Sequence, residues 1–238
     1  VLILLVCGLL GGIGYRLSSD LLEASATDLT KRISREAMIE MQRLIEPAEM
    51  ATRLLSLQQI SRATSLDERL DSLEYLRRAL DSSSALSSLY VGYDNGDFFL
   101  VGRVGHGSAN EAARVPAGTR YVVQSIEQAP GGPRGRFIYL DAALKTLRED
   151  QRPDYAAAYD PRRRPWYSQG LASATQIKTP PYLFFSSGRV GTTLAGRSVD
   201  GRSVVGADIL LDTLGQTLAR QKATPGSQLV LVNSQGYA

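Results

Sequence analysis

Apolar residues recur at every third or fourth position from residue 18 to about residue 64, with most of the charged residues between them. This period places the apolar side chains on one face of an α-helix. The stripe comprises Leu22, Ala26, Leu29, Ile33, Ala37, Met41, Leu44, Ala48, Ala51 and Leu55. A helix of about 45 residues is roughly 65 Å long, beyond the usual globular length. Pro47 is expected to kink or interrupt it. One long spine is the favoured interpretation, and a two-helix hairpin broken near Pro47 is the alternative.

The chain begins with an apolar run that carries no charged side chain before Arg16. Spanning a bilayer takes roughly 20 apolar residues, so residues 1–17 are interpreted as part of a transmembrane helix of a longer chain. Tyr15 and Arg16 are typical of a helix end at the membrane interface. The alternative is the core of a signal peptide. The helical pattern that continues from Leu17, with no Ala-x-Ala cleavage site directly after the run, favours the transmembrane helix.

The periodicity changes after residue 65. Leucines spaced along one face predict a second, shorter helix over residues 66–80. Two apolar segments, 86–93 and 97–104, then flank Asp94-Asn95-Gly96. Asn-Gly between strand-forming residues is a strong signal for a β-hairpin.

The rest of the chain predicts more strands and two further helices. Strands are expected at residues 119–128, 136–141, 182–187, 190–198, 202–209 and 228–233. Helices are expected at 164–172, where Pro165 suits the first turn, and at 210–221; residues 144–149 are expected to form a helical turn or linker. Antiparallel strands with helices beside them define an α+β fold. The strand that follows Thr224-Pro225-Gly226 is interpreted as the start of a second β module.

Composition removes several function classes. The formal charge of +3 is too small to indicate a nucleic-acid partner, and one cysteine, Cys7, permits neither a disulfide framework nor a cysteine metal site. The one histidine, His106, lies in a glycine-rich loop, where a solvated side chain is more common than a catalytic one. No catalytic set, metal cluster or phosphate-binding loop stands out. We therefore expect no cofactor, no metal and no catalytic residues.

The chemistry of the chain is concentrated between Tyr159 and Tyr182. This stretch contains the only Trp and a run of three arginines between two prolines, which restrict the backbone. Planar guanidinium groups, aromatic faces and phenol hydroxyls on a stiff turn suit the capture of a small anion. The alternative interpretation makes Trp166 and Tyr167 core residues that hold the short helix against the sheet, and Asp160 a cap of the turn before it.

The order of these features resembles a known family. A long helix, a hairpin, the motif Asp160-Pro161-Arg162-x-Arg164-Pro165-Trp166-Tyr167, then Pro181-Tyr182 and finally Val205-Gly206-Ala207-Asp208-Ile209 before a helix are similar to the double Cache sensor domains of bacterial receptors. The resemblance covers roughly residues 18–238. It implies two PAS-like modules on one long helix, of which the membrane-distal module binds the ligand.

The resemblance also implies a division of the chain and a set of ligand contacts. Residues 1–17 would be a partial transmembrane helix, 18–64 a helix leaving the membrane, 65–221 the membrane-distal module, and 222–238 the start of the membrane-proximal one. In the amino-acid-binding branch, matching residues hold the carboxylate (Arg164, Trp166) or occupy the other polar positions (Tyr159, Tyr167, Tyr182, Asp208). Many amino-acid binders carry an acid where this chain has Phe184, which weakens the expected amine contact.

The favoured function is an extracytoplasmic sensor region, in the bacterial inner membrane, that binds a small carboxylate or amino acid. It would control a cytoplasmic output domain. The sequence most resembles family members whose output domain is an adenylate or guanylate cyclase or a phosphohydrolase. Homodimerisation along the long helix is the expected protein–protein contact. The alternatives are a structural or dimerisation module without ligand, and a membrane-anchored hydrolase that uses Asp160 or Asp208 as base.

Overall fold

The computed structural model describes residues 2–105, 115–220 and 230 of the chain. These residues fall into two compact units, one from the chain before residue 43 and after residue 215, and one from residues 43–215. The second unit contains the whole β-sheet and the aromatic stretch identified in the sequence. The strand expected at residues 228–233, and with it the start of a second module, lies outside the described residues apart from Val230.

The first element is a single α-helix, α1 (Leu2–Leu55), which continues through Pro47. The favoured long helix is thus confirmed, although it begins earlier and ends about nine residues sooner than the predicted limit at residue 64. Ala48, Ala51 and Leu55, from the predicted apolar stripe, are buried. Ala48 and Ala51 therefore let this end of α1, which belongs to the second unit, pack closely within that unit.

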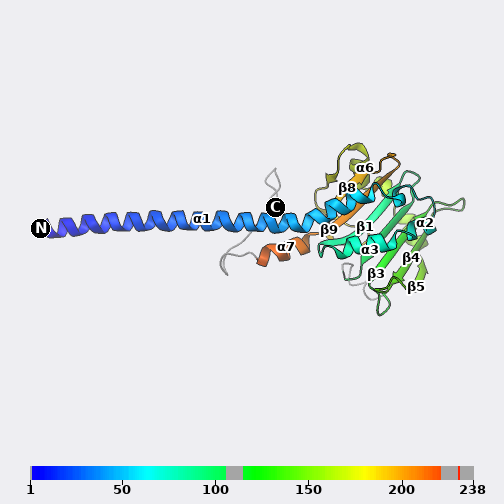
Figure 1. Ribbon diagram of the computed structural model, residues 1–238, viewed down its shortest axis with the longest axis horizontal. Coiled ribbons are helices and arrows are strands. Elements are labelled where there is room, and N and C mark those ends of the chain that lie inside the picture. The colour runs from blue at the N-terminus through cyan, green and yellow to red at the C-terminus, as the bar shows by residue number, and fades with distance from the viewer. Residues whose placement is uncertain (1, 106–114, 221–229, 231–238) are drawn as a thin grey trace. The chain divides into compact units, whose positions relative to one another are not determined.

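The described residues form an antiparallel sheet in the order β5-β4-β3-β2-β1-β9-β8-β6, with β7 paired to β8 (Figure 1). Its strands are β1 (Leu86–Tyr93), β2 (Phe98–Arg103), β3 (Tyr121–Glu127), β4 (Arg134–Leu140), β5 (Thr146–Gln151), β6 (Ile177–Lys178), β7 (Tyr182–Leu183), β8 (Val190–Arg197) and β9 (Ser203–Leu210). The central pair joins β1 to β9, with Ser88 opposite Asp208 and Tyr90 opposite Gly206. This pairing brings together residues about 120 positions apart in the sequence.

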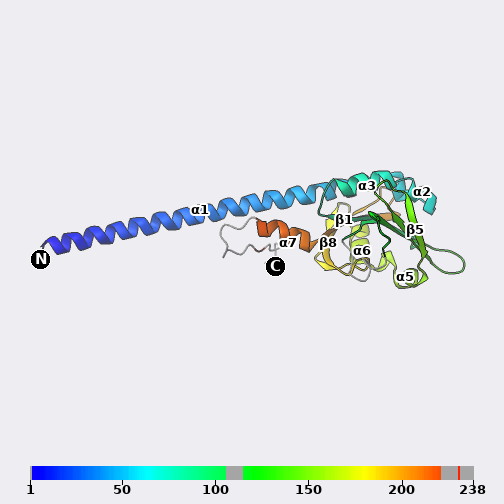
Figure 2. The ribbon, with the colours of Figure 1, turned by 90° about the horizontal axis from the view of Figure 1, so that it is seen from below.

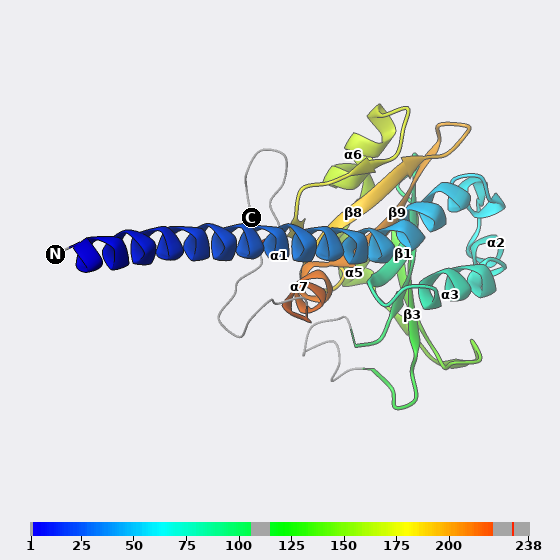
Figure 3. The same cartoon turned by 60° about the vertical axis from the view of Figure 1, so that its left-hand side comes forward.

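Helices cover both faces of the sheet. The remaining elements are η1 (Gln59–Arg62), α2 (Leu66–Leu70), α3 (Leu73–Asp81), α5 (Pro153–Ala158), η2 (Pro161–Arg163), α6 (Pro165–Ala172) and α7 (Leu211–Arg220). Figure 2 shows α3 on one side of the strands, with α5 and α6 on the other. Figure 3 shows α3 crossing the same face as the last turns of α1, where the Ser83 hydroxyl donates to the carbonyl of Leu44 at 3.3 Å.

Local sequence explains most of these elements. The Asn-Gly hairpin is confirmed: Gly96 has φ +92°, which glycine adopts without a steric penalty, and the amide of Asp97 donates to the Asn95 side chain. The predicted helix over 66–80 is split into α2 and α3. The α+β class, with a long helix and an antiparallel sheet flanked by helices, is confirmed.

The segment at residues 144–149 was predicted wrongly. Residues 144–149 were expected to be a helical turn or linker, but Thr146–Gln151 is the edge strand β5, paired with β4. Its side chains are almost all exposed, so neither face shows the apolar alternation by which a half-buried strand is recognised. Backbone pairing with β4, rather than burial, holds this strand in place.

Candidate functional site

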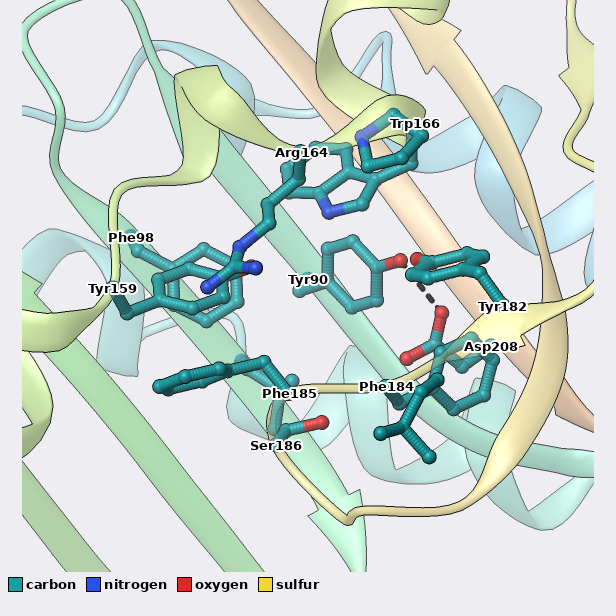
Figure 4. Close-up of a pocket in the computed structure, with 13 residues that line it drawn as sticks. Tyr90, Phe98, Tyr159, Arg164, Trp166, Tyr182, Phe184, Phe185, Ser186 and Asp208 are labelled. Carbon is teal, nitrogen blue, oxygen red and sulfur yellow. Dashed lines mark hydrogen bonds between the residues drawn. The ribbon is translucent and has the colours of Figure 1, made fainter.

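A pocket opens on the sheet face that carries α5 and α6, and Figure 4 shows its lining. It encloses about 380 Å³, its open mouth included. The lining residues are Tyr90, Phe98, Leu100, Tyr159, Arg164, Pro165, Trp166, Tyr182, Leu183, Phe184, Phe185, Ser186 and Asp208. They come from three regions: the central strands, the turn before α6 with the first residues of that helix, and β7 with the segment that connects it to β8.

The turn before α6 is organised by its own side chains. The Asp160 carboxylate accepts from the amide of Arg162 at 3.0 Å and also pairs with the Arg162 guanidinium, which caps η2. Arg164 then stands in extended conformation as the N-cap of α6, and Pro165 occupies the first helical position. The side chain of Arg162 thus forms an ion pair with Asp160. The side chain of Arg164 points into the pocket instead (Figure 4).

Trp166 packs beneath this turn. Its ring is buried and lies edge-on to Tyr90, with centroids 4.8 Å apart. Gly92 permits the approach, because a Cβ there would lie 2.7 Å from Cη2 of Trp166. Trp166 therefore serves both as a wall of the pocket and as the contact that fixes α6 against β1.

Arg164 has aromatic neighbours but no counter-charge in the part of the chain that the structure describes. Its guanidinium carbon lies 4.6 Å from the ring centroids of both Tyr159 and Phe185. Its Nε is buried and meets no hydrogen-bond acceptor among the described residues. Cation–π contacts of this kind contribute about 0.5–2 kcal/mol each, but they satisfy no N–H group. The guanidinium thus presents unused donors beside the pocket.

Asp208, at the other end of the pocket, has three hydroxyl partners. Its carboxylate accepts from the hydroxyls of Tyr90 at 2.6 Å, Thr193 at 2.6 Å and Ser88 at 3.0 Å. The Tyr182 hydroxyl lies 2.7 Å from Oγ1 of Thr193 and joins the same network. Register explains the cluster, because Asp208 on β9 faces Ser88 on β1 and Thr193 on β8.

Burial sets the electrostatics of this cluster. Desolvation raises the pKa of Asp208 to about 6, against the opposing effect of its three hydroxyl donors. Burial likewise raises the pKa of the Tyr90 and Tyr182 phenols, with the Asp208 charge as the next cause, so both remain protonated hydrogen-bond donors. Within the described ranges, no three His, Cys, Asp or Glu side chains gather as a metal site requires.

Two glycines make room for the pocket's aromatic rings. A Cβ at Gly206 would lie 2.1 Å from Cε2 of Tyr90. A Cβ at Gly191 would lie 2.3 Å from Cε2 of Phe184. The rings of Tyr90 and Phe184 therefore lie directly on backbone, which is why glycine occupies both strand positions.

Five of the six predicted contact residues line this pocket: Tyr159, Arg164, Trp166, Tyr182 and Asp208. Tyr167 is not among its lining residues. It is buried against Trp166, and burial raises the pKa of its phenol, with the charge of Asp94 as the next cause. That these residues bind a ligand stays a prediction. Phe184 is buried in the lining, with its ring 5.0 Å from that of Tyr182.

Sequence reasoning missed Tyr90, Phe98 and Phe185. Tyr90 and Phe98 lie on hairpin strands whose residues are almost all buried, so nothing in the pattern separates them from ordinary core residues. Phe185 was assigned to a strand. It instead lies in the connection that follows β7, 44% exposed, and covers the guanidinium of Arg164.

The antiparallel sheet with its long N-terminal helix has the fold of known solved domains. The sensory domain of the Campylobacter jejuni chemoreceptor Tlp3 (CcmL) superposes with a TM-score of 0.51 and 18% identity, covering 87% of this chain and 68% of that one. The Tlp3 ligand-binding domain in complex with L-valine gives 0.50 and 19%, covering 87% and 67%. The resemblance to double Cache sensor domains is confirmed at the level of the fold.

Sequence comparison identifies signalling proteins. Adenylate cyclase 1 of Rhizobium meliloti is 30% identical over 156 residues, which are 65% of this chain and 23% of that protein. The methyl-accepting chemotaxis protein McpB of Bacillus subtilis is 36% identical over 102 residues, 42% of this chain and 14% of that protein. The chain thus spans less than a quarter of these relatives. No protein-family model matches it.

The predicted membrane segment was also compared with the structure. Residues 2–17 are helical, as expected. Among the described residues, no helix has a stretch long and apolar enough to cross a membrane. The assignment of residues 1–17 to a partial transmembrane helix stays a prediction.

Proposed function

We propose that this chain is the extracytoplasmic sensor region of a membrane-bound bacterial receptor and that its pocket binds a small metabolite through a carboxylate. The observation that carries the proposal is Arg164. Its guanidinium lines the pocket, its Nε is buried without an acceptor among the described residues, and no acid of that part of the chain pairs with it. A buried N–H group without an acceptor costs about 1–3 kcal/mol, and a ligand carboxylate would remove that cost.

The shape of the site supports the same class of ligand. A guanidinium presents parallel N–H groups that match the two oxygens of a carboxylate. The rings of Tyr159 and Phe185, whose centroids are 5.2 Å apart, both contact the guanidinium, and each centroid lies 4.6 Å from its carbon. The pocket is small, since its empty space is about 380 Å³ even with the open solvent at its mouth included. Together these features favour a metabolite with few atoms beyond its carboxylate.

The comparisons support the role of receptor. Sensor domains of the same fold belong to chemoreceptors, and one of them was crystallised with L-valine. The longer sequence match is to an adenylate cyclase, 156 residues against 102 for McpB. We therefore infer that the complete receptor controls a cytoplasmic nucleotide cyclase, and that residues 18–238 lie outside the bacterial inner membrane.

Binding to the whole chain tests the site. Titration calorimetry and thermal shift would be run with a panel of small carboxylates and amino acids, on the natural sequence, Arg164→Ala and Arg163→Ala. Arg163 is the matched control, since it is the exposed neighbour in the same turn and carries the same charge. Arg164→Ala should weaken binding on the order of 100-fold, the loss of a charged hydrogen-bond pair, while Arg163→Ala should keep it. Binding that survives in Arg164→Ala would overturn the site.

The output is tested separately in the full-length receptor. Cyclic nucleotide production in membranes should change on addition of the best-binding ligand, and Arg164→Ala should abolish that change while leaving the unstimulated rate. A ligand that binds the chain yet alters no cyclase activity would overturn the proposed output without affecting the binding site.

A further inference from the structure

The two charged groups that line the pocket, Arg164 and Asp208, differ in how many of their hydrogen-bonding positions have partners in the chain. Arg164 has donors without acceptors, whereas the Asp208 carboxylate already accepts three hydrogen bonds from its own chain. An ionised carboxylate offers about four acceptor positions. The pocket is therefore open toward a ligand's negative group and largely filled where a positive group would have to bind.

Counting hydroxyl hydrogens makes the filling stricter. Thr193 has one hydroxyl hydrogen and donates it to Asp208 at 2.6 Å. The hydroxyl of Tyr182, 2.7 Å from Thr193, must then act as the donor in that contact. Ser88 and Tyr90 also donate to Asp208. Three hydroxyl hydrogens thus point to Asp208 and that of Tyr182 points to Thr193, so an incoming ammonium would find at most one of the four acceptor positions of the carboxylate open.

The other neighbours of Asp208 offer no second acid. The groups around it are Ser88 and Tyr90 from β1, Thr193 from β8, and Tyr182 from β7, with Phe184 beside Tyr182. Phe184 is 3% exposed and rests against Gly191, so its ring fills this side of the lining. Arg164 is the cation that lines the pocket, and its charge acts on Tyr182. An ammonium at this position would contact the Asp208 carboxylate, which already accepts three hydrogen bonds, and the ring of Phe184, which offers no acceptor.

We propose that the ligand is a small monocarboxylate without an ammonium group, held by Arg164, with its uncharged end against Tyr182, Phe184 and the Asp208 network. This rests on the proposed function and names the ligand class of the same site. A ligand of net negative charge would be repelled by ionised Asp208, so binding should be accompanied by proton uptake at that carboxyl. Because its pKa already lies near 6, the uptake falls within an accessible pH range.

Matched pairs of ligands test the proposal directly. L-Lactate would be compared with L-alanine, and L-2-hydroxy-3-methylbutanoate with L-valine, by titration calorimetry of the whole chain at one pH and salt concentration. Each pair differs in a hydroxyl against an ammonium. The amine-free member should bind at least about tenfold more tightly, because an ammonium in this pocket would lack a full set of acceptors. Equal or tighter binding of the amino acids would overturn the proposal and leave the carboxylate site at Arg164 standing.

The pH dependence gives an independent readout on the unaltered protein. Affinity for the amine-free ligand should rise as pH falls from 8 to 5.5, with net proton uptake seen by calorimetry in buffers of different ionisation enthalpy. A zwitterion would favour ionised Asp208 and show no uptake. Asp208→Asn, of nearly the same shape, should retain amine-free binding and lose its pH dependence. Loss of binding by an Asp208→Asn protein that melts normally would overturn the proposal. If no carboxylate binds at all, the proposed function fails with it.

Discussion

Two arginines in the second unit, the buried Arg69 and the half-buried Arg164, show how a charge with a partner differs from a charge without one. Arg69 at the hairpin end of the sheet pairs with Asp97, with Nη2 and Oδ2 2.6 Å apart. Arg164 in the pocket has no such carboxylate among the described residues. Both guanidiniums lie over aromatic rings, Arg69 at 4.4 Å from Tyr93 and Arg164 at 4.6 Å from Tyr159. Aromatic contact is therefore common to both, and counter-charge separates them.

The Asp97 carboxylate also accepts a backbone hydrogen bond, in addition to the ion pair. Its Oδ1 accepts from the amide of Gln128 at 2.7 Å, so the ion pair ties α2 to the hairpin and to the end of β3. The side chain of Arg69 is 0% exposed. A charge sealed in this way acts on folding, whereas the guanidinium that lines an open pocket remains available to a ligand.

The largest effect should come from Arg69→Ala. Removing one member of a buried ion pair leaves an uncompensated charge on Asp97 and typically costs about 3–5 kcal/mol. The free energy of unfolding from denaturant titration would measure it. Arg78→Ala serves as the control, since its exposed pair with Glu74 should be worth less than about 1 kcal/mol. Equal losses in the two variants would remove the distinction between sealed and exposed charge.

The next effect concerns the strand under the pocket. Gly206→Ala would push a methyl group into the Tyr90 ring and should cost about 1–3 kcal/mol of stability by overpacking. It should also weaken ligand binding, because Tyr90 would leave Asp208. Gly102→Ala is the matched control on the same face, where the nearest atom to a new Cβ lies at 3.5 Å. Unchanged stability and binding in Gly206→Ala would show that the Tyr90 ring can move away from the new methyl group at no cost.

A comparable effect is expected from pH. The folded pKa of Asp208, about 6, exceeds the unfolded value near 4. Between these values the folded state binds a proton that the unfolded state has released, so this carboxyl's contribution to stability is present below about pH 4 and lost as pH rises through 6. Relative to the natural sequence, Asp208→Asn should therefore gain on the order of 1–3 kcal/mol of stability between pH 4 and pH 7. Parallel stability curves for the two proteins would contradict the raised pKa.

The smallest effect on stability should come from Arg164→Ala. Two cation–π contacts are lost, at about 0.5–2 kcal/mol each, while the cost of a buried N–H without an acceptor disappears. The net change in unfolding free energy should stay within about 1 kcal/mol. A loss as large as that of Arg69→Ala would show that Arg164 serves the fold in the same way.

Local signals were enough for much of the fold. The apolar stripe of α1, the Asn95-Gly96 turn and Pro165 at the start of α6 each act within a few residues, and each predicted its element. β5 was missed because its exposed side chains carry no pattern, and its conformation depends on pairing with β4. Sequence patterns that act within a few residues cannot predict an element whose conformation is caused by pairing with another strand.

The site residues also differ in whether local sequence or long-range pairing brings them to the pocket. Arg164 and Trp166 share one motif, so a single stretch of sequence indicated both. Asp208 was linked to them by family resemblance, and Tyr90 was not indicated at all, since its hydrogen bond to Asp208 joins residues 118 positions apart. The hydroxyl donors that fill the carboxylate became visible only once the register of β1, β8 and β9 was known.

The pairing of β1 with β9 also has a consequence for how the protein folds. Contacts between residues so distant in the chain form late, because loop-closure entropy is lost before they contribute. The hairpin of β1 and β2 can form early, but the pocket does not exist until β9 has joined β1. We expect hydrogen exchange during refolding to protect the β1–β2 amides before those of β1–β9. A ligand would then bind only the completed sheet and act as a late stabiliser of the whole unit.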